Sequence, residues 1–187
     1  MSALTRSHSP VTQVVAIGIG AALFFVLGRF AAIPSPVPNT SINIQYAVLA
    51  VFAVLYGPLV GALAGIIGHV LVDATGYGIW VSWELASGVF GLIVGLALLR
   101  HAIEDGEFTR STAIRVNVAI VLANAVSWLL VAPLGDVVIY GEPAAKVWTQ
   151  GGLSFIVNSL TACILGTIIL AVYARTRTRT GSLSREQ

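Results

Sequence analysis

Four ionisable side chains border or interrupt apolar segments of this 187-residue chain. A charged group at the centre of a membrane span costs about 2.5–3.5 kcal/mol on insertion scales, so each such residue indicates a function or a partner. Arg29, Asp73 and Glu84 fall at ends of three apolar segments, where they could clamp a polar ligand as a charged ring. The alternative is that these three residues pair with one another or extend to water.

His69 lies four residues before Asp73, which places both side chains on one face of a helix. A metal site would need a further histidine or cysteine nearby, and the single cysteine, Cys163, lies far along the chain. The pattern therefore favours a hydrogen bond to a ligand or a structural His–Asp contact. No metal ion or cofactor is predicted.

Two further pairs follow the same four-residue spacing, Asn124 with Trp128 and Ser154 with Asn158. Hydrogen bonding between helices is the common role of asparagine in membranes, and contact with a ligand is the other interpretation. The four tryptophans all fall near one predicted membrane surface, which favours stacking surfaces for a planar ligand: Trp80, Trp83, Trp128 and Trp148. Tyr56 and Tyr173 mark the opposite surface, so anchoring also contributes to the aromatic pattern.

A polar, proline-rich stretch spans residues 29–46 between two apolar segments. Pro34, Pro36 and Pro38 alternate, so no α-helix can pass through them and an extended, stiff loop is expected. Five hydrogen-bonding side chains follow the prolines: Asn39, Thr40, Ser41, Asn43 and Gln45. The stretch predicts a binding mouth. The alternative is an ordinary external loop with a helix cap at residues 39–41.

The composition is 57% hydrophobic and only 10% charged. A soluble domain carries about 25% charged residues, so the chain is expected to lie in a lipid bilayer. Basic residues fall at helix ends rather than in a patch, which argues against nucleic-acid binding. No nucleotide-binding loop, nucleophile–base pair or metalloprotease pattern is present, so the chain has no visible energy source.

Apolar runs broken by glycine, proline and charge predict an all-α membrane protein, a bundle of six transmembrane helices in a single domain over residues 1–187. The expected helices span residues 11–30, 42–56, 59–73, 83–100, 116–132 and 151–173. Pro133 is expected to stop the fifth helix and to leave residues 134–149 as a polar connector. The second and third helices are short, so neighbours should shield them or the bilayer should thin around them.

Six crossings place both termini on one side of the membrane. Eight of the ten basic residues would lie on that side: Arg6, Arg100, Arg110, Arg115, Arg175, Arg177, Arg179 and Arg185. Only Arg29 and Lys146 would lie on the other, so the positive-inside rule predicts cytoplasmic termini. The 29–46 stretch, the loop around Tyr77 and the 134–149 connector then all face outward, which predicts an outward-opening binding site.

Three stretches resemble the substrate-binding S components of energy-coupling factor (ECF) vitamin transporters, in particular the riboflavin-type subfamily. They are VVAIGIGAALFFVLGRFAAIPSPVPNTSINIQYA, LYGPLVGALAGIIGHVLVDA and WVSWELASGVFGLIVGL. The most specific motifs are PNT-x-I-x-x-QYA and GPxxGxxxGxxGHxxxD. The resemblance implies an outward-facing binder of a vitamin-like molecule that associates with a transmembrane T component and two cytoplasmic ATPases.

The resemblance also implies roles for particular segments. Residues 33–41 would form a lid, and small residues at four-residue spacing on the first helix would contact the T component. The matching residues are Ala16 with Gly20 and Gly18 with Ala22. The expected ligand contacts are Arg29, Asn39, Gln45, Asp73, Trp83, Glu84, Trp128 and Asn158, followed by His69 and Asn124.

The prediction is therefore a multi-pass protein of the plasma membrane that is not an enzyme. It would bind a vitamin or vitamin-like molecule, riboflavin or another heteroaromatic precursor, for ATP-driven uptake. A competing hypothesis is a membrane-embedded enzyme that acts on a lipid or isoprenoid with Asp73, Glu84 and His69 as acid–base groups or metal ligands. A third is a structural protein whose polar rim contacts only another protein.

Overall fold

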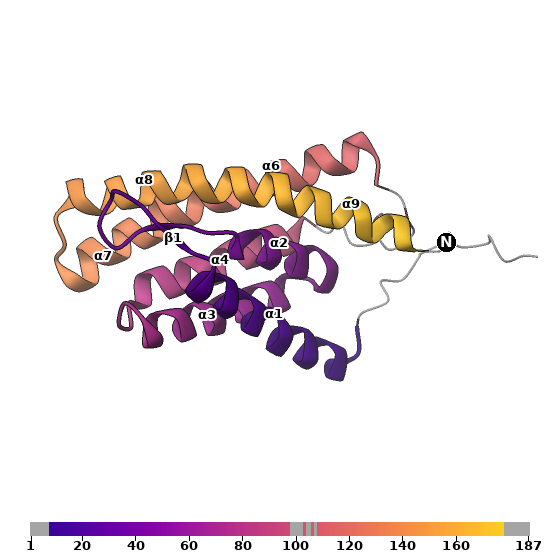
Figure 1. Ribbon diagram of the computed structural model, residues 1–187, viewed down its shortest axis with the longest axis horizontal. Helices are drawn as coiled ribbons and strands as arrows, with labels where there is room; N and C mark the ends of the chain where they lie inside the picture. The colour runs from indigo at the N-terminus through magenta and orange to yellow at the C-terminus, as the bar shows by residue number, and fades with distance from the viewer. Residues whose placement is uncertain (1–7, 98–102, 104–105, 107, 178–187) are drawn as a thin grey trace, which may run out of the picture.

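The computed structural model describes residues 8–97, 103, 106 and 108–177, and its helices lie along one another in an elongated bundle (Figure 1). The first half contains α1 (Pro10–Phe30), α2 (Gln45–Tyr56), α3 (Pro58–Thr75) and α4 (Val81–Leu96). The second half contains α6 (Arg110–Val126), the π-helical turn η1 (Ser127–Val131), α7 (Ala132–Tyr140), α8 (Ala144–Thr161), the π-helical turn η2 (Ala162–Gly166) and α9 (Thr167–Thr176). The described chain is nearly all helical, as predicted.

Four continuous helical stretches are long and apolar enough to cross a membrane: Pro10–Phe30, Pro58–Thr75, Arg110–Tyr140 and Ala144–Thr176. Two apolar helices, Gln45–Tyr56 and Val81–Leu96, are shorter. The expected end of the fourth helix, residues 98–100, lies outside the described residues, as do Arg6, Arg100, Arg179 and Arg185 of the predicted cytoplasmic side.

The proline-rich stretch forms a small hairpin rather than a plain extended loop. Its strands, β1 (Ile33–Pro34) and β2 (Ser41–Ile42), are antiparallel and pair Ile33 with Ile42. Because Ser41 and Ile42 belong to this ladder, the second helix begins at Gln45 and not at residue 42. Its N-cap is Ile44, which makes no side-chain capping hydrogen bond, so the alternative of a helix cap at residues 39–41 is wrong.

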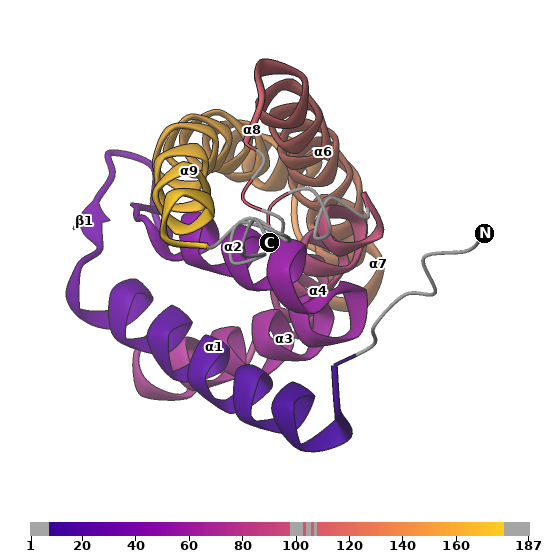
Figure 2. The same cartoon turned by 90° about the vertical axis from the view of Figure 1, so that its right-hand side faces the viewer.

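Helix α2 is the centre of the bundle. Nine of its 12 residues are buried, including the fully enclosed Leu49, Ala50 and Ala53. It contacts α1, α3, α4, α8 and η2, and Figure 2 shows it between α9 and the α3–α4 pair. The expectation that neighbours shield this short helix is confirmed. A helix enclosed by its neighbours has little contact with lipid, so its length need not match the thickness of the bilayer.

Glycines bring α3 and α4 into backbone contact. A Cβ atom on Gly61 would lie 2.5 Å from the carbonyl oxygen of Gly91, and one on Gly65 would lie 2.5 Å from that of Ser87. Gly95 packs in the same way against Pro58. Small residues allow such close approach between helices in lipid, where packing rather than the hydrophobic effect holds helices together. This contact fixes the relative positions of His69 on α3 and Ser87 on α4.

The prediction that Pro133 ends a helix at residue 132 is wrong. Helix continues without a break through Arg110–Tyr140, with the π-helical turn η1 directly before Ala132. Proline lacks the N–H that would bond to the carbonyl four residues earlier, which belongs to Leu129. The indole of Trp148 donates to that carbonyl instead, at 3.1 Å. A neighbouring side chain thus satisfies the carbonyl, so the helix can continue.

The predicted connector over residues 134–149 is also mostly helix. Helix α7 ends at Tyr140, Gly141 adopts a left-handed conformation with φ 68°, and α8 begins at Ala144 rather than at residue 151. The true connection is only a few residues long. Asp136 consequently belongs to a helix and faces the interior, with 2% of its surface exposed.

The small residues of α1 divide between the inside and the outside of the molecule. Ala16 and Gly20 are buried, and a Cβ atom on Gly20 would lie 3.0 Å from Phe52 and 3.2 Å from Ala64. This pair packs within the bundle, which leaves little of it exposed for contact with a partner protein. Gly18 and Ala22 are exposed, and nothing lies within 4 Å of a Cβ on Gly18.

Candidate ligand-binding site

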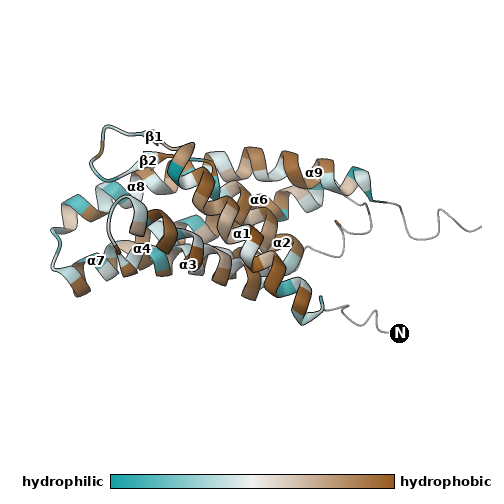
Figure 3. Cartoon of the chain, turned by 60° about the horizontal axis from the view of Figure 1, so that its bottom comes forward, coloured by the Kyte–Doolittle hydropathy of each residue, from teal (hydrophilic) through white to brown (hydrophobic). Residues whose placement is uncertain are grey.

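A cavity opens at the end of the bundle that holds β1, β2, α7 and the start of α8, where polar residues gather (Figure 3). Its enclosed volume is about 150 Å³, below the range of about 300–1,000 Å³ for small-molecule sites, and its mouth is open. The lining residues come from α1, the hairpin, α2, α3, the loop before α4, α4, η1, α7 and α8. A small-molecule ligand of ordinary size would therefore extend into the open mouth of the cavity.

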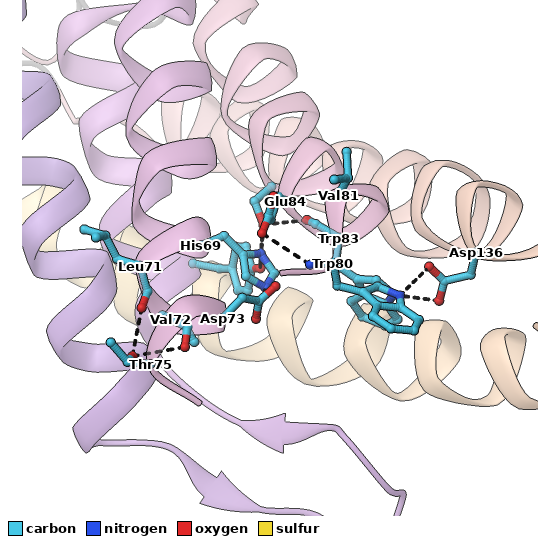
Figure 4. A network of polar contacts seen from close by, with 12 residues as sticks. His69, Leu71, Val72, Asp73, Thr75, Trp80, Val81, Trp83, Glu84 and Asp136 are labelled. Atoms are coloured by element: carbon cyan, nitrogen blue, oxygen red, sulfur yellow. Dashed lines mark hydrogen bonds and ion pairs between the residues drawn. The ribbon is translucent and has the colours of Figure 1, made fainter. Parts of the chain in front are cut away.

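Asp136 joins α7 to the start of α4. Its Oδ1 accepts hydrogen bonds from the indole N–H of Trp80, at 2.8 Å, and from the hydroxyl of Ser82. Its Oδ2 accepts from the indole N–H of Trp83, also at 2.8 Å. Figure 4 shows the carboxylate beside an indole ring. Hydrogen bonds to a charged acceptor are stronger than neutral ones, so Asp136 holds both rings firmly in the cavity wall.

Stacked aromatic rings form one side of the cavity. The rings of Trp83 and Trp128 lie 5.5 Å apart at an interplanar angle of 29°, and Tyr46 meets Trp128 edge-on at 5.1 Å. Trp128 belongs to η1 and donates its indole N–H to Asn124 Oδ1 at 2.8 Å. The predicted common face of Asn124 and Trp128 is confirmed. Asn124 supports the wall from behind and does not line the cavity.

A short polar network crosses from α3 to α4 and α2. His69 Nδ1 lies 2.5 Å from Ser87 Oγ, which lies 2.8 Å from the hydroxyl of Tyr46. On the other side of the ring, His69 Nε2 lies 3.7 Å from Asp73 Oδ1 (Figure 4). The predicted His69–Asp73 contact is therefore present. Hydrogen bonds across the helix pair hold the imidazole in one orientation beside the cavity.

The hairpin reaches across the mouth of the cavity to α8. The side-chain amide of Gln150 donates to the backbone carbonyl of Pro38 at 2.9 Å. Within the hairpin, Ser35 and Thr40 share a hydroxyl–hydroxyl hydrogen bond of 2.6 Å, and Asn39 adopts a left-handed φ of 57°. Asparagine tolerates that conformation better than most residues. The bend at Asn39 turns the polar edge of the hairpin toward the cavity, which Asn39, Thr40 and Ser41 line.

Seven of the ten predicted ligand contacts line this cavity: Asn39, Gln45, His69, Asp73, Trp83, Trp128 and Asn158. Arg29 is exposed and lines a neighbouring hollow under the proline-rich segment. Glu84 is buried in the first turn of α4. Its Oε1 accepts a hydrogen bond from the backbone N–H of Trp80 at 3.3 Å. Arg29, Asp73 and Glu84 therefore do not surround the cavity as a ring.

Several residues that line the cavity were not among the ten expected ligand contacts: Thr40, Ser41, Asn43, Tyr46, Tyr77, Trp80, Asp136, Lys146, Gln150 and Ser154. Asp136, Lys146 and Gln150 were missed because their segment was expected to be an external connector or to precede a helix. Trp148 is the residue that allows the helix to continue past Pro133. Its indole N–H donates to the carbonyl of Leu129, which Pro133 leaves without its usual partner. Tyr46 sits inside the QYA motif but carries no charge, and it was not selected.

The comparisons with known proteins agree with this architecture. A family described as "ECF-type riboflavin transporter, S component" matches residues 9–175. Proteins named UPF0397 protein are 49% identical over 183 residues in Lactococcus lactis subsp. cremoris (strain SK11), covering 97% of each chain, and 51% identical over 177 residues in Streptococcus gordonii, covering 94% of this chain and 95% of that one.

A solved structure shares the fold. The crystal structure of FolT bound with folic acid has a TM-score of 0.60 and 17% identity, and the alignment covers 85% of this chain and 93% of FolT. The resemblance seen in the PNT-x-I-x-x-QYA and GPxxGxxxGxxGHxxxD motifs is confirmed across nearly the whole chain. The chain belongs to the family of ECF-type riboflavin transporter S components.

Proposed function

We propose that this S component captures a planar, vitamin-like molecule in the cavity between the hairpin and helices α3, α4, α7 and α8. Riboflavin and other heteroaromatic vitamin precursors are the ligands that the family suggests. The observation that carries the proposal is the cavity itself. It combines stacked walls at Trp83 and Trp128 with buried polar side chains at Asp73 and Asn158. Such a mixture of aromatic surface and a few placed polar groups is typical of small-molecule sites.

The proposed orientation has six crossings in the plasma membrane, both termini in the cytoplasm and the cavity open to the outside. The described start of α1 and the end of α9 lie toward one end of the bundle, and β1 and α7 lie toward the other (Figure 1). Arg110, Arg175 and Arg177 belong to the end away from the cavity. Their excess there supports cytoplasmic placement of that end.

The proposed lid is residues 33–41, which form the arch of the hairpin. Its contact with the bundle through Gln150 and Pro38 is a single side-chain hydrogen bond of 2.9 Å. A neutral hydrogen bond of this kind is worth only about 0.5–1.5 kcal/mol. Opening this bond to admit the ligand would therefore cost little, and the two-strand ladder would keep the shape of the hairpin as it moves.

For transport, the S component would associate with a membrane T component and two ATPases. The exposed face of α1 is a suitable docking surface for the T component, because it presents the small residues Gly18 and Ala22 together with large apolar side chains such as Val14 and Ile19. Small residues at four-residue spacing permit close helix contact in lipid. Of the two predicted pairs, this is the one that remains accessible.

Replacing Gly18 with leucine is expected to leave ligand binding unchanged and to abolish uptake in cells that express the T component and ATPases. The new side chain meets no atom of this chain, so it changes only the outer face of α1. Gly20→Leu is the matched comparison, and it should lower the thermal stability of the isolated protein because Phe52 and Ala64 occupy the space. Normal uptake by the Gly18→Leu protein would rule out this docking surface.

Protein purified after expression in rich medium is expected to carry its ligand. Denaturing the sample and examining the extract by mass spectrometry should reveal a small heteroaromatic molecule. Adding that molecule to the emptied protein should raise its unfolding temperature, because a ligand that binds only the folded state stabilises it. If the extract contains no such molecule and no member of a vitamin panel, riboflavin included, raises the unfolding temperature, the proposed function is wrong.

A further inference from the structure

Oxygen atoms without hydrogen-bond partners gather in the residues around the cavity. Four lining residues hold such a buried atom: Asn43 Oδ1, Gln45 Oε1, Asp73 Oδ2 and Asn158 Oδ1. Among the residues that the structure describes, every buried side-chain polar atom without a partner is an oxygen. A buried polar group left without a partner costs about 1–3 kcal/mol. Three of these oxygens belong to amides that also carry N–H donors, whereas an ionised Asp73 carboxylate only accepts, so donors from outside the chain could satisfy it.

Five of the donor side chains around the cavity are already engaged within the protein. The indole N–H groups of Trp80 and Trp83 bond to Asp136, and that of Trp128 bonds to Asn124. The Gln150 amide donates to Pro38, and the ammonium group of Lys146 lies 2.7 Å from Glu142. A ligand rich in acceptors would have to compete for these donors. A ligand rich in donors would find Asp73 and its neighbours open.

The charged groups around the cavity also favour a ligand that presents hydrogen-bond donors. Two carboxylates line it, Asp73 and Asp136, against the one ammonium group of Lys146, which Glu142 already neutralises. Asp136 accepts three hydrogen bonds, whereas the nearest cationic or imidazole nitrogen to Asp73 is His69 Nε2 at 3.7 Å. Asp73 is only 3% exposed, so water cannot screen it well. A negatively charged group placed beside Asp73 would be repelled.

We infer that the ligand is neutral or positively charged and presents N–H donors to Asp73, as an amino-substituted nitrogen heteroaromatic ring does. This inference rests on the proposed ligand-binding function and narrows its ligand class. A carboxylate can accept two parallel N–H bonds from an amino group and an adjacent protonated ring nitrogen. The same ring would pack against the partly exposed indole of Trp83, which itself stacks on the buried Trp128. A flavin ring fits less well, because carbonyl and ring-nitrogen acceptors outnumber its single N–H.

The test compares two small probes on the full-length purified protein, 2,4-diaminopyrimidine and uracil. They share a ring, but amino groups in the first replace carbonyl groups in the second. Titrations followed by ligand-observed NMR should show that diaminopyrimidine binds at least about tenfold more tightly, since hydrogen bonds to a charged group are worth about 1.5–3 kcal/mol. In the Asp73→Asn protein, which keeps the side-chain shape, this preference should fall below about threefold.

Thr149→Val is the control, because it changes an exposed polar side chain at the same end of the molecule that does not line the cavity and bonds only to Ala145 of its own helix. It should preserve the preference for diaminopyrimidine. Equal binding of the two probes, binding of neither, or a preference that survives Asp73→Asn overturns the inference. If riboflavin nevertheless stabilises the protein, the proposed function stands and only the ligand class is wrong. If neither riboflavin nor any other vitamin tested binds, both the inferred ligand class and the proposed function are wrong.

Discussion

Replacing Gly151 with alanine is expected to lower both the thermal stability of the protein and its affinity for the ligand, while the same change at Gly152 leaves both nearly unaltered. A Cβ atom on Gly151 would overlap the backbone carbonyl of Trp128 and lie 3.0 Å from Pro133, and nothing lies within 4 Å of one on Gly152. Overpacking of this kind costs about 1–3 kcal/mol, and backbone atoms cannot rotate aside.

The consequence for binding follows from what Gly151 touches. Helix α8 must move away from η1 to accommodate the methyl group, and η1 carries Trp128, whose ring stacks on Trp83 in the cavity wall. Thermal unfolding followed by tryptophan fluorescence and ligand titration would measure both effects. We expect roughly tenfold weaker binding, equivalent to about 1.4 kcal/mol. Equal behaviour of the Gly151→Ala and Gly152→Ala proteins would show that the α8–η1 contact does not position the wall.

Replacing Asp136 with alanine is expected to have the largest effect on the site. The change leaves the indole N–H groups of Trp80 and Trp83 and the hydroxyl of Ser82 without their acceptor. Each unpartnered buried donor costs about 1–3 kcal/mol, so a total loss of about 3 kcal/mol or more is expected. The link between α7 and α4 is lost as well, so the cavity should lose its ligand affinity.

Asp136→Asn separates the hydrogen bonds from the packing, because asparagine fills the same volume with one acceptor instead of two. We expect it to fall between the native and alanine proteins in unfolding temperature and in ligand affinity. Glu142→Ala, at the exposed end of the next connection, provides a control for loss of a carboxylate from the same region. An Asp136→Ala protein with native unfolding temperature and affinity would contradict the anchoring role.

Local spacing in the chain predicted several contacts correctly. Asn124 with Trp128 and His69 with Asp73 are each four residues apart, and the structure brings each pair together. Such contacts follow from the geometry of one helix, so they need no knowledge of its neighbours. The apolar runs likewise predicted the first four helices within a few residues over the part that the structure describes.

Errors arose wherever a second element changed the outcome. Pro133 does not end its helix, because Trp148 donates to the carbonyl that proline leaves unpaired. Ala16 and Gly20 look the same in sequence as Gly18 and Ala22, but the first pair packs against neighbouring helices and the second is exposed. A repeat of small residues shows that close contact is permitted, and it does not identify which surface makes the contact.

The chain alone therefore determined the class of protein, the order of its apolar helices, the family motifs and seven of the residues that line the candidate site, because these depend on composition and on spacing within one segment. Only the tertiary structure decided that Asp136 and Gln150 belong to the cavity, that Arg29 and Glu84 do not line it, and that the hairpin reaches α8 through Pro38. Those outcomes depend on contacts between residues far apart in the chain, whose partners are chosen by the packing of helices against one another.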